Sequence, residues 1–378
     1  MTRALVFAGG GTGGHIFPAL AIAEHLGSED GRSPVVHVVC SVRALDARIL
    51  AANGVAFTPI PAAPPSAHPK RLVRFLRSWG PSVRTSRALL RSLREAHGVV
   101  VVVAMGGYVA APVVQAARVE RCPVVLVNLD AAPGKANRWI ARHAEHIFTS
   151  APVDRNGWER VPPIVRSIAR ASDTPANCRE SLGLAPDRPT LLVTGASQGA
   201  RSINRFMAAF AARHASTLEG WQVVHQSGPE GEEELVRAYA EAGIAAVVAP
   251  FFESMGQAWG AADLAISRAG AGSVGEVWAN GVPTVFMPYP YHRDQHQRLN
   301  AAPLESVGGC VICADRIEPE ANLTDAGTHL ARLLGDSAVR ASMRSALASL
   351  GPADGAQRIA QSPSLRSPAR VIAGKNHA

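Results

Sequence analysis

A histidine among five glycines forms the first candidate site of the chain. Gly9 to His15 reads GGGTGGH and lies between an apolar run, Ala4 to Ala8, and an apolar-periodic pattern from Ile16 to Leu26. This order predicts a strand, a glycine turn and the start of a helix. Amides at a helix start favour an anion, and an imidazole titrates near neutral pH. The segment is therefore interpreted as a phosphate or diphosphate site that carries one imidazole.

The same glycines satisfy G-x-G-x-x-G, the pattern of dinucleotide-binding turns, through Gly9, Gly11 and Gly14. A dinucleotide site also requires an acid at the end of the second strand, where it binds the ribose hydroxyls. The next apolar run, Val35 to Cys40, ends in Ser41 instead. The sequence therefore disfavours NAD.

Length and composition are those of a globular protein with two domains. The chain has 378 residues, of which 47% are hydrophobic and 18% charged, and no apolar run approaches the ~20 residues of a membrane span. The N-terminus shows no signal-peptide pattern. Most of the five cysteines fall in or beside apolar runs, so buried thiols in a reducing cytoplasm are expected. Cys310 and Cys313 form a lone CxxC, for which zinc or redox use is a lesser alternative.

The net charge of +8 comes from an excess of basic residues in the first half of the chain. Most of this excess lies between Lys70 and Arg94, a segment without acids in which arginines alternate with apolar side chains. One interpretation is two solvated helices that pack on the core. The other is docking on an anionic bilayer, with Phe75 and Trp79 at the interface and the arginines on phosphates. No nucleic-acid motif accompanies the charge, so no nucleic-acid partner is expected.

Apolar strand-like runs alternate with helical patterns in both halves of the chain, which predicts parallel sheets covered on both faces. The expected strands of the first half are 4–8, 35–40, 55–60, 99–104, 124–129 and 146–149, and those of the second half are 190–194, 222–225, 245–249, 264–267, 284–287 and 310–313. A proline-rich linker from Ala151 to Pro189 separates them. The prediction is an α/β protein of two doubly wound, Rossmann-like lobes with a cleft between them.

The second half carries two further strand-to-helix turns with small residues. Leu191 to Arg201 reads LLVTGASQGAR, and Ser267 to Glu276 reads SRAGAGSVGE. Their amides and serines suit a diphosphate, and Glu276 could accept hydrogen bonds from both hydroxyls of a ribose. The alternative for Glu276 is a helix acid that complements the dipole. Side-chain amides and one imidazole between Asp294 and Asn300 suit sugar hydroxyls.

Five segments, taken together and in order, resemble the successive signatures of the MurG family of glycosyltransferases. They are GGGTGGHIFPALAIA (9–23), MGGYVAAP (105–112), GASQGARSIN (195–204), SRAGAGSVGE (267–276) and PYPYHRDQHQRLNA (288–301). The resemblance implies a two-lobed GT-B fold and an inverting enzyme that transfers N-acetylglucosamine (GlcNAc) from UDP-GlcNAc to lipid I to form lipid II in peptidoglycan synthesis. It further implies a peripheral protein on the cytoplasmic face of the plasma membrane, docked through Lys70 to Arg94. The expected division is an acceptor and membrane-binding lobe over 1–164, a donor lobe over 165–349, and a C-terminal helix returning to the first lobe with a disordered tail over 350–378.

The resemblance also assigns residues to the two substrates. In the donor lobe Glu276 would bind ribose, Gln297 the sugar, and Phe252 uracil through its main chain, with Arg166 near the nucleotide. The nucleotide and diphosphate would be lined by Ser197, Ala271, Gly272, Ser273, Val274 and Gly275. In the first lobe Thr12, Gly13 and Gly14 would face the undecaprenyl-diphosphate-linked acceptor, and His15 would lie next to its reacting hydroxyl, where it can act as base. No Asp-x-Asp pair occurs in the chain, so no metal or other cofactor is expected.

Two departures from the family pattern affect the acceptor side. Where the family has His-Glu-Gln-Asn this chain reads Val127-Asn128-Leu129-Asp130, and where it has Gly-Asn-Pro-Val-Arg this chain reads PPIVR from Pro162 to Arg166. Asp130 would replace a neutral amide near His15 and form a base dyad with it. Alternative functions are a related transferase acting on another lipid such as a diacylglycerol, a non-catalytic UDP-sugar-binding paralogue, and, more distantly, a UDP-sugar epimerase.

Overall fold

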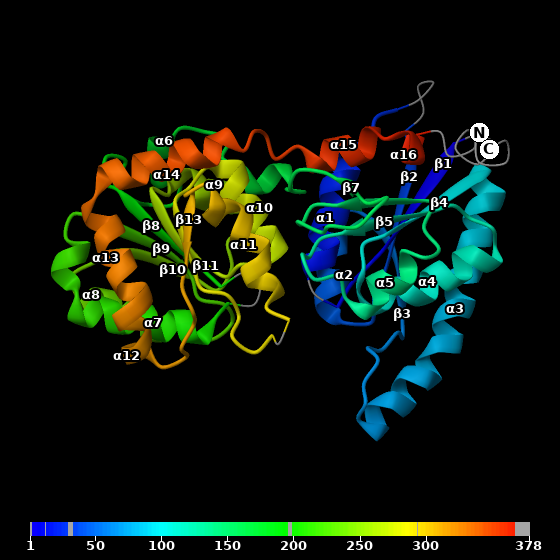
Figure 1. The fold of residues 1–378 in the computed structure, drawn as a ribbon, viewed down its shortest axis with the longest axis horizontal. Coiled ribbons are helices and arrows are strands. Elements are labelled where there is room, and N and C mark those ends of the chain that lie inside the picture. The colour runs from blue at the N-terminus through cyan, green and yellow to red at the C-terminus, as the bar shows by residue number, and fades with distance from the viewer. Residues whose placement is uncertain (1, 12, 29–32, 196–198, 293, 367–378) are drawn as a thin grey trace. The chain divides into compact units, whose positions relative to one another are not determined.

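The chain divides into two compact units of similar size. The computed structural model describes residues 2–11, 13–28, 33–195, 199–292 and 294–366. The first unit is Met1–Arg166 together with the chain from Asp354 onward, and the second is Ser167–Ala353. Each unit is built on one parallel sheet (Figure 1).

The first unit contains a seven-stranded parallel sheet in the order β3-β2-β1-β4-β5-β6-β7. Its strands are β1 (Arg3–Ala8), β2 (Val35–Ser41), β3 (Ala56–Ile60), β4 (Val99–Ala104), β5 (Val124–Asn128), β6 (His146–Thr149) and β7 (Glu159–Arg160). Its helices are α1 (Gly13–Glu24), α2 (Ala44–Ala52), α3 (Pro69–His97), α4 (Gly107–Val119), α5 (Lys135–Ile140), α15 (Gly355–Gln361) and α16 (Pro363–Arg366). The strand order reverses between β1 and β4, which is where ligands bind in such sheets.

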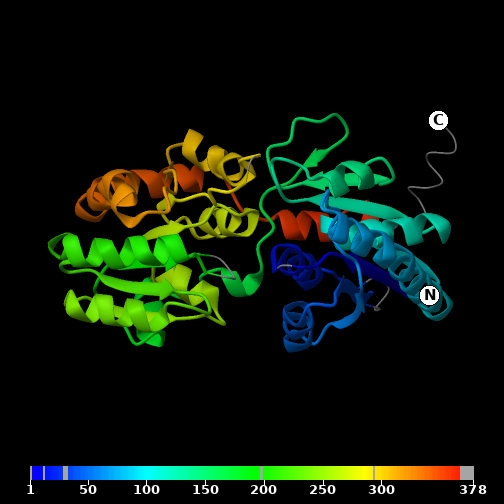
Figure 2. The ribbon, with the colours of Figure 1, turned by 90° about the horizontal axis from the view of Figure 1, so that it is seen from below.

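The continuous valine runs fold as strands because helices cover both faces of the sheet. On one face, β1 and β4 pack against residues of α3, α4 and α5, including Leu90, Val113 and Ile140, which are fully buried. On the other face, α1 contacts α2 and α15, so the chain after Asp354 returns to the first unit (Figure 2). The Gly355 amide donates to the Pro163 carbonyl at this return.

The basic segment forms one 29-residue helix, α3, with Pro81 inside it, rather than the two helices considered from the sequence. Its C-terminal half is anchored, because Arg87 and Arg91 pair with Glu120 at 2.8 and 3.0 Å. Phe75 and Trp79 are half-buried, and the Trp79 ring lies 6.4 Å from that of Trp139 on α5. The two aromatic side chains therefore pack partly on the protein and stay partly exposed. The most exposed large apolar side chains on α3 are Leu72, Val73 and Leu76.

The second unit repeats the architecture with a six-stranded parallel sheet in the order β10-β9-β8-β11-β12-β13. Its strands are β8 (Thr190–Thr194), β9 (Gln222–Gln226), β10 (Ala245–Ala249), β11 (Leu264–Ser267), β12 (Thr284–Phe286) and β13 (Cys310–Ile312). Its α-helices are α6 (Pro175–Ser181), α7 (Arg201–Arg213), α8 (Glu232–Glu241), α9 (Met255–Ala261), α10 (Ala271–Asn280), α11 (His296–Ser306), α12 (Pro319–Asn322), α13 (Thr328–Gly335) and α14 (Ser337–Ser349). Shorter helical segments are η1 (Ser167–Ala169), η3 (Ala215–Leu218) and η4 (Leu323–Gly327). Here the strand order reverses between β8 and β11.

The sheet of the second unit separates two core clusters. One cluster joins the strands to α7, α8 and α13, and the other joins them to α9, α10 and α11. Cys313 belongs to the first cluster and Cys310 to the second, so the CxxC thiols lie in different parts of the core. All five cysteines are free and buried, as predicted. Among the described residues, no helix is both long enough and apolar enough to cross a membrane.

Candidate functional site

In the first unit, the turns after β1, β4 and β5 meet at the carboxyl edge of the sheet. The MGGY turn begins after β4, and its Gly107 has φ of +75°. A Cβ added at Gly107 would lie 3.0 Å from the Cε1 atom of His15, so the imidazole packs directly against this glycine. The two glycine motifs that the sequence analysis singled out in this half therefore form one site at the strand-order reversal.

His15 is the third residue of α1, and its ring is half-buried. Its Nδ1 atom is buried without a hydrogen-bond partner among the described residues. Burial lowers the pKa of His15 below 6.5, while the charges of Asp130 and Asp46 and the Gly10 carbonyl oppose this shift. The imidazole is therefore neutral at physiological pH and able to accept a proton. Gly13 and Gly14 precede it in the first turn of α1, and Thr12 lies outside the described residues.

A buried carboxylate that the sequence analysis missed holds the first glycine turn in place. Asp46 on α2 is fully buried, and its Oδ2 accepts hydrogen bonds from the Gly11 amide at 2.7 Å, the Ser41 amide at 3.1 Å and the Ser41 hydroxyl at 2.6 Å. The Arg43 guanidinium donates to the Gly11 carbonyl. Both sides of Gly11, which has φ of +89°, are thus held by the segment that follows β2. Asp46 follows Ser41 by only five residues, so its contact with Ser41 is local in the sequence, whereas its contact with the Gly11 amide is not.

Replacing Asp46 with alanine is expected to destabilise the first unit by about 3 kcal/mol, because three buried donors lose their acceptor. The freed turn would also displace His15 and lower kcat roughly tenfold or more. Thermal denaturation and initial rates measure the two effects.

Asp46→Asn is the matched control for this prediction. Oδ1 of Asp46 has no partner among the described residues, so an asparagine can place its carbonyl oxygen where Oδ2 lies and keep all three hydrogen bonds. We expect near-wild-type stability and rate for this variant. A harmless Asp46→Ala substitution would show that the turn does not depend on this acceptor.

The departure from the family pattern after β5 builds a polar network next to the MGGY turn. Asn128 is fully buried and donates to the Asp130 carbonyl at 2.8 Å and to Thr149 Oγ1 at 3.1 Å. Its Oδ1 accepts a hydrogen bond from Asn137 of α5 at 2.9 Å. A Cβ added at Gly106 would lie 2.7 Å from Asn137 Oδ1, so the network abuts that glycine. Asn128 therefore fixes the backbone that carries Asp130, whose charge is the largest influence raising the pKa of His15.

In the second unit, α10 begins directly after the β11 turn and presents its first-turn amides at the edge of the sheet. Ala271, Gly272 and Ser273 occupy this turn, followed by the buried Val274 and Gly275. Apart from its chain neighbours and the backbone of α10, no atom of the described residues lies within 4 Å of a Cβ added at Gly272. The amides of a first helical turn have no partner within the helix, so this end can accept an anion.

Glu276 extends from the next turn of α10 and is held by one hydrogen bond. Trp259 Nε1 donates to its Oε2 at 2.9 Å, and the Asn280 side chain donates to its backbone carbonyl at 2.8 Å. Burial raises the pKa of Glu276 to about 7, and the Trp259 hydrogen bond opposes this shift. A carboxylate that is costly to ionise in the free protein is stabilised by added hydrogen-bond donors, such as a pair of hydroxyls.

Other expected donor-side residues gather around this helix. Phe252, 9% exposed, packs in one cluster with Trp259 and Val274. Gln297 on α11 accepts a hydrogen bond from the Tyr289 amide at 2.8 Å, which ties the start of α11 to the loop after β12. Ser197 lies outside the described residues.

Arg166 belongs to the first unit, of which it is the last residue before Ser167. There it pairs with Glu24 at 2.8 Å and donates to Asn53 at 2.8 Å.

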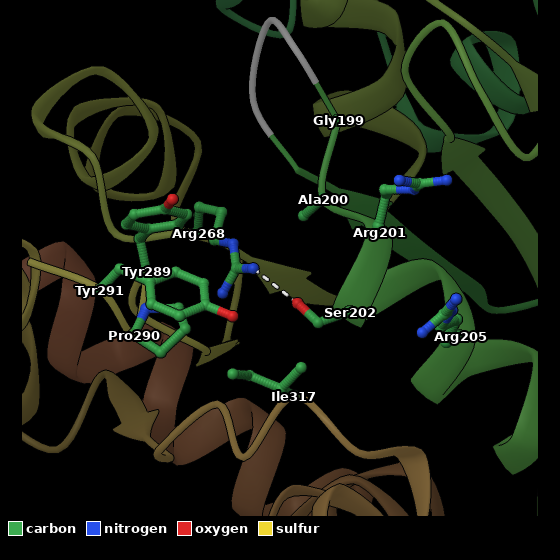
Figure 3. A pocket seen from close by; sticks show the side chains of 10 residues that line it. All are labelled: Gly199, Ala200, Arg201, Ser202, Arg205, Arg268, Tyr289, Pro290, Tyr291 and Ile317. Atoms are coloured by element: carbon green, nitrogen blue, oxygen red, sulfur yellow. Dashed lines mark hydrogen bonds between the residues drawn. The ribbon is translucent and has the colours of Figure 1, made fainter.

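A pocket of about 340 Å³ opens beside the start of α7 in the second unit (Figure 3). Its lining comprises Gly199, Ala200, Arg201, Ser202, Arg205, Arg268, Tyr289, Pro290, Tyr291 and Ile317. The two tyrosine rings lie on one side and Arg201 and Arg205 on the other. The sequence analysis quoted the motif that contains Arg201 but gave this arginine no role.

Arg268 forms the inner wall of this pocket and joins three loops. Its Nη1 pairs with Asp315 Oδ2 at 2.7 Å and donates to the Met287 carbonyl at 2.8 Å, and its Nη2 donates to Ser202 Oγ at 2.8 Å. The side chains of Arg268 and Asp315 are 9% and 0% exposed. This buried pair fixes the β11 turn, the β12 loop and the start of α7 relative to one another.

Comparison with known proteins covers both units. Residues 5–149 match the glycosyltransferase family 28 N-terminal domain, and residues 190–359 match the glycosyltransferase family 28 C-terminal domain. The chain is 37% identical over 366 residues to the UDP-N-acetylglucosamine–N-acetylmuramyl-(pentapeptide) pyrophosphoryl-undecaprenol N-acetylglucosamine transferase of Leifsonia xyli subsp. xyli, covering 94% of this chain and 96% of the relative. It is 38% identical over 368 residues to the same transferase of Clavibacter michiganensis, covering 94% of each.

Solved structures agree with this relationship. Acinetobacter baumannii MurG superposes with a TM-score of 0.69 at 26% identity, covering 95% of this chain and 98% of that one. A UDP-N-acetylglucosamine 2-epimerase superposes with a TM-score of 0.64 at 14% identity, covering 98% and 97%, and shares the fold alone. The chain therefore belongs to glycosyltransferase family 28, in the MurG family of GT-B glycosyltransferases.

Proposed function

We propose that this protein transfers GlcNAc from UDP-GlcNAc to the MurNAc 4-hydroxyl of lipid I, forming lipid II in peptidoglycan synthesis. The observation that carries the proposal is the identity of 37% over 94% of the chain, which spans both units, to a transferase of this activity. Members of the same fold with 14% identity include an epimerase, so the fold by itself would not select this reaction.

In this proposal the second unit binds the donor. The first-turn amides of α10, at Ala271, Gly272 and Ser273, meet the diphosphate, and Glu276 accepts hydrogen bonds from the ribose hydroxyls. The Phe252 main chain contacts uracil beside Val274 and Gly275, and Gln297 contacts the sugar. Ser197 and Arg166 complete the set by resemblance to the family.

The first unit supplies the acceptor site and the base. Thr12, Gly13 and Gly14 face the acceptor, whose diphosphate is attracted by the helix start of α1. His15 removes the proton from the MurNAc 4-hydroxyl as that oxygen attacks the anomeric carbon of GlcNAc. The bond to UDP breaks on the opposite face, so the configuration inverts, and the amides of α10 stabilise the charge that develops on the diphosphate. Each step uses side chains and amides of the chain, so we expect transfer in the presence of a chelator.

The acceptor can be identified by incubating purified protein with UDP-[14C]GlcNAc and either a lipid I analogue or diacylglycerol vesicles. We expect transfer to the lipid I analogue alone. Transfer to diacylglycerol would assign the chain to a related lipid transferase. UDP binding without transfer to either acceptor would indicate a non-catalytic UDP-sugar-binding protein.

We propose that Asp130 orients His15 and stabilises the protonated imidazole that forms during the reaction. Replacing Asp130 with asparagine removes the largest influence that raises the pKa of His15, so the acid limb of the kcat profile should move to lower pH. We expect kcat at neutral pH to fall roughly tenfold, since a weaker base takes the proton. Asp154→Asn, an exposed change in the same unit, is the control. An unchanged kcat and pH profile would rule out the dyad.

The protein is further proposed to dock on the cytoplasmic face of the plasma membrane through the N-terminal half of α3. Leu72, Val73 and Leu76 are 41%, 53% and 61% exposed, and exposed arginines lie between and beside them. Arg71, Arg74 and Arg77 have no ion pair among the described residues, whereas Arg87 and Arg91 are engaged by Glu120. These exposed and unpaired side chains lie in the first part of the segment, so the proposed membrane-binding surface is Lys70–Arg77 and not the whole of Lys70–Arg94. Exposed apolar and basic side chains on one helix suit an anionic bilayer.

The double substitution Leu76→Ser/Arg77→Glu is expected to weaken binding to phosphatidylglycerol-containing vesicles about 30-fold. Replacing arginine with glutamate changes the local charge by two units, and each charge near the surface contributes about 1 kcal/mol to binding. Co-sedimentation at low salt measures this change. Val236→Ser/Arg237→Glu alters an equally exposed pair on α8 of the second unit and should bind like the wild type. An equal loss of vesicle binding in both variants would show that the docking surface is not the N-terminal half of α3.

A further inference from the structure

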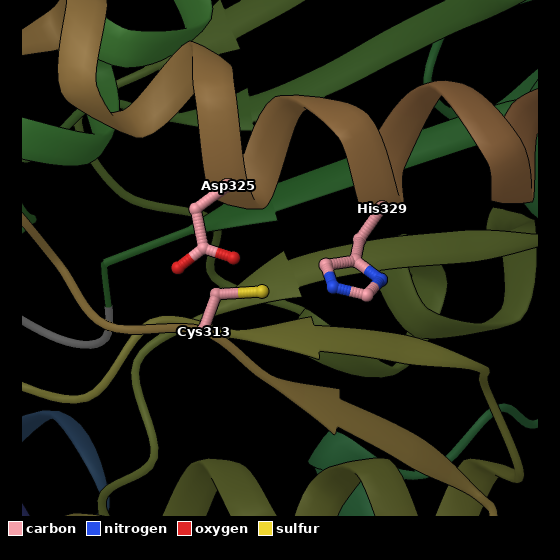
Figure 4. Close-up of side chains that lie close together, drawn as sticks. All are labelled: Cys313, Asp325 and His329. Carbon is pink, nitrogen blue, oxygen red and sulfur yellow. The ribbon is translucent and has the colours of Figure 1, made fainter.

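Three side chains that commonly bind metals meet in the second unit, next to β13. Cys313 directly follows this strand, Asp325 lies in η4, and His329 lies in the first turn of α13 (Figure 4). One ligand atom from each side chain can be chosen so that all three lie within 4.8 Å of one another. The cluster joins the end of a core strand to the helix that covers it.

Local geometry explains why Asp325 and His329 act together. They are four residues apart, and residues at this spacing lie on the same face of a helix. The segment Leu323–Gly327 is a π-helical turn, a form that is rare and often found at functional sites. Both side chains are half-buried, while Cys313 is 2% exposed. The site is therefore closed on the strand side and open to an ion and a water molecule on the helix side.

The polar atoms of the three side chains are not engaged elsewhere in the described part of the chain. Among the described residues, none of these side chains takes part in a side-chain hydrogen bond or an ion pair, although Cys313 also packs in the core. The nearest sequence partner, Cys310, lies in the core cluster on the other face of the sheet. A CxxC chelate is thus excluded by geometry, and Cys313 is left with an acid and an imidazole as neighbours.

A Cys-His-Asp nucleophile is the other chemistry that this set of residues could suggest. It requires an accessible thiolate. Burial, Asp325 and Glu305 together raise the pKa of Cys313 to about 12, and the thiol is shielded from solvent. The Cys313 thiol is therefore not an accessible nucleophile, and a reactive cysteine does not fit.

We propose that Cys313, Asp325 and His329 form a structural binding site for a divalent transition-metal ion of the zinc class, with water as the fourth ligand. Sulfur, nitrogen and oxygen ligands in this combination suit zinc. Bonds of about 2.0–2.3 Å to a tetrahedral ion bring ligand atoms to about 3.5 Å from one another, a distance that small side-chain rotations can reach. On binding, the metal–sulfur bond forms as the thiol proton is released to solvent. The ion would tie β13 to α13 and takes no part in the transfer reaction.

Titration of the full-length, chelator-stripped protein with CoCl₂ tests the site, because cobalt takes the place of zinc and reports a thiolate ligand by its charge-transfer absorption. We expect one equivalent to bind with that absorption, ZnCl₂ to displace it, and ZnCl₂ to raise the Tm. Cys313→Ser should abolish the charge-transfer band, and Asp325→Asn and His329→Gln should each lower affinity roughly tenfold or more.

Cys310→Ser is the matched control, because it changes the other thiol of the same CxxC, and it should keep the cobalt spectrum. Each variant is first compared with the wild type in chelator for its Tm, so that a folding defect is separated from a lost ligand. Absence of a thiolate band in the wild type, or equal binding by the wild type and all three ligand variants, would overturn the proposal. The experiment measures metal binding and Tm and not GlcNAc transfer, so its failure would not count against the proposed transferase function.

Discussion

His15→Ala is expected to lower kcat by about 10²–10⁴-fold, the range that a positioned general base contributes. The His15 ring packs against Gly107, and its Nδ1 atom is buried, so the protein fixes the position of the ring and shields this nitrogen from solvent. The rate of GlcNAc transfer at saturating donor and acceptor measures the loss.

The pH profile separates the loss of a base from a loss of structure. Burial lowers the pKa of His15, so the neutral, proton-accepting form persists below pH 6.5. The kcat of the wild type should therefore be flat near neutrality and fall as the pH drops through that lowered pKa. His15→Ala should lack this limb, and His25→Ala, a histidine just after α1, should keep both rate and profile. A wild-type profile in His15→Ala would show that another group is the base.

Glu276→Ala is expected to weaken UDP-GlcNAc binding by about 10²–10³-fold, because two ribose hydroxyls lose a charged acceptor. The donor KM should rise with the loss of affinity, and calorimetry with UDP measures that loss directly. Glu241→Gln, at the exposed end of α8, is the control for a lost negative charge in the same unit.

The pH dependence of UDP binding gives Glu276 a distinctive signature. The pKa of about 7 in the free protein should fall when the hydroxyls donate to the carboxylate, so binding releases a proton near neutral pH. UDP affinity should therefore decrease as the pH falls through about 7, and Glu276→Gln should bind more weakly without this dependence. A pH-independent wild-type affinity would contradict the ribose role.

The same shift predicts how stability depends on pH in the absence of nucleotide. The pKa of Glu276 is raised above its unfolded value of about 4.3. Its favourable contribution is therefore complete below about pH 4.3 and is lost as the pH rises through about 7. At pH 8 Glu276→Gln should raise the Tm of the free protein. This substitution trades donor affinity for stability, as expected of a binding residue.

Strand positions could be predicted from the sequence almost residue by residue. The runs 99–104, 146–149, 190–194, 245–249 and 264–267 are strands with those bounds, because the strands of covered parallel sheets form short, mostly apolar runs. The two-residue strand β7, Glu159–Arg160, was not predicted, since both residues are exposed and give no apolar signal. The interpretation of the basic segment as two helices was wrong, because α3 continues through Pro81 as one helix.

Some residues of the candidate site could be predicted from a local sequence motif, and others are recognised only by contacts made in the folded chain. His15 and Glu276 stand within glycine-rich turns, so their place at a sheet edge followed from the turn. Asp46, Asn128 and Trp259 each make a contact with a residue 9–35 positions away, in addition to any closer ones, and no local pattern marks such distant partners. The cluster of Cys313, Asp325 and His329 is of the same kind, because a helix turn brings two of its members together and the fold adds the third.

The central claim is that the first unit holds the base and the second unit holds the donor nucleotide. Titrating the His15→Ala protein with UDP in a calorimeter tests this division most directly. We predict the same affinity and the same proton release as the wild type, in a protein that has lost transfer. A His15→Ala protein that no longer binds UDP would place His15 in the nucleotide site and contradict the account.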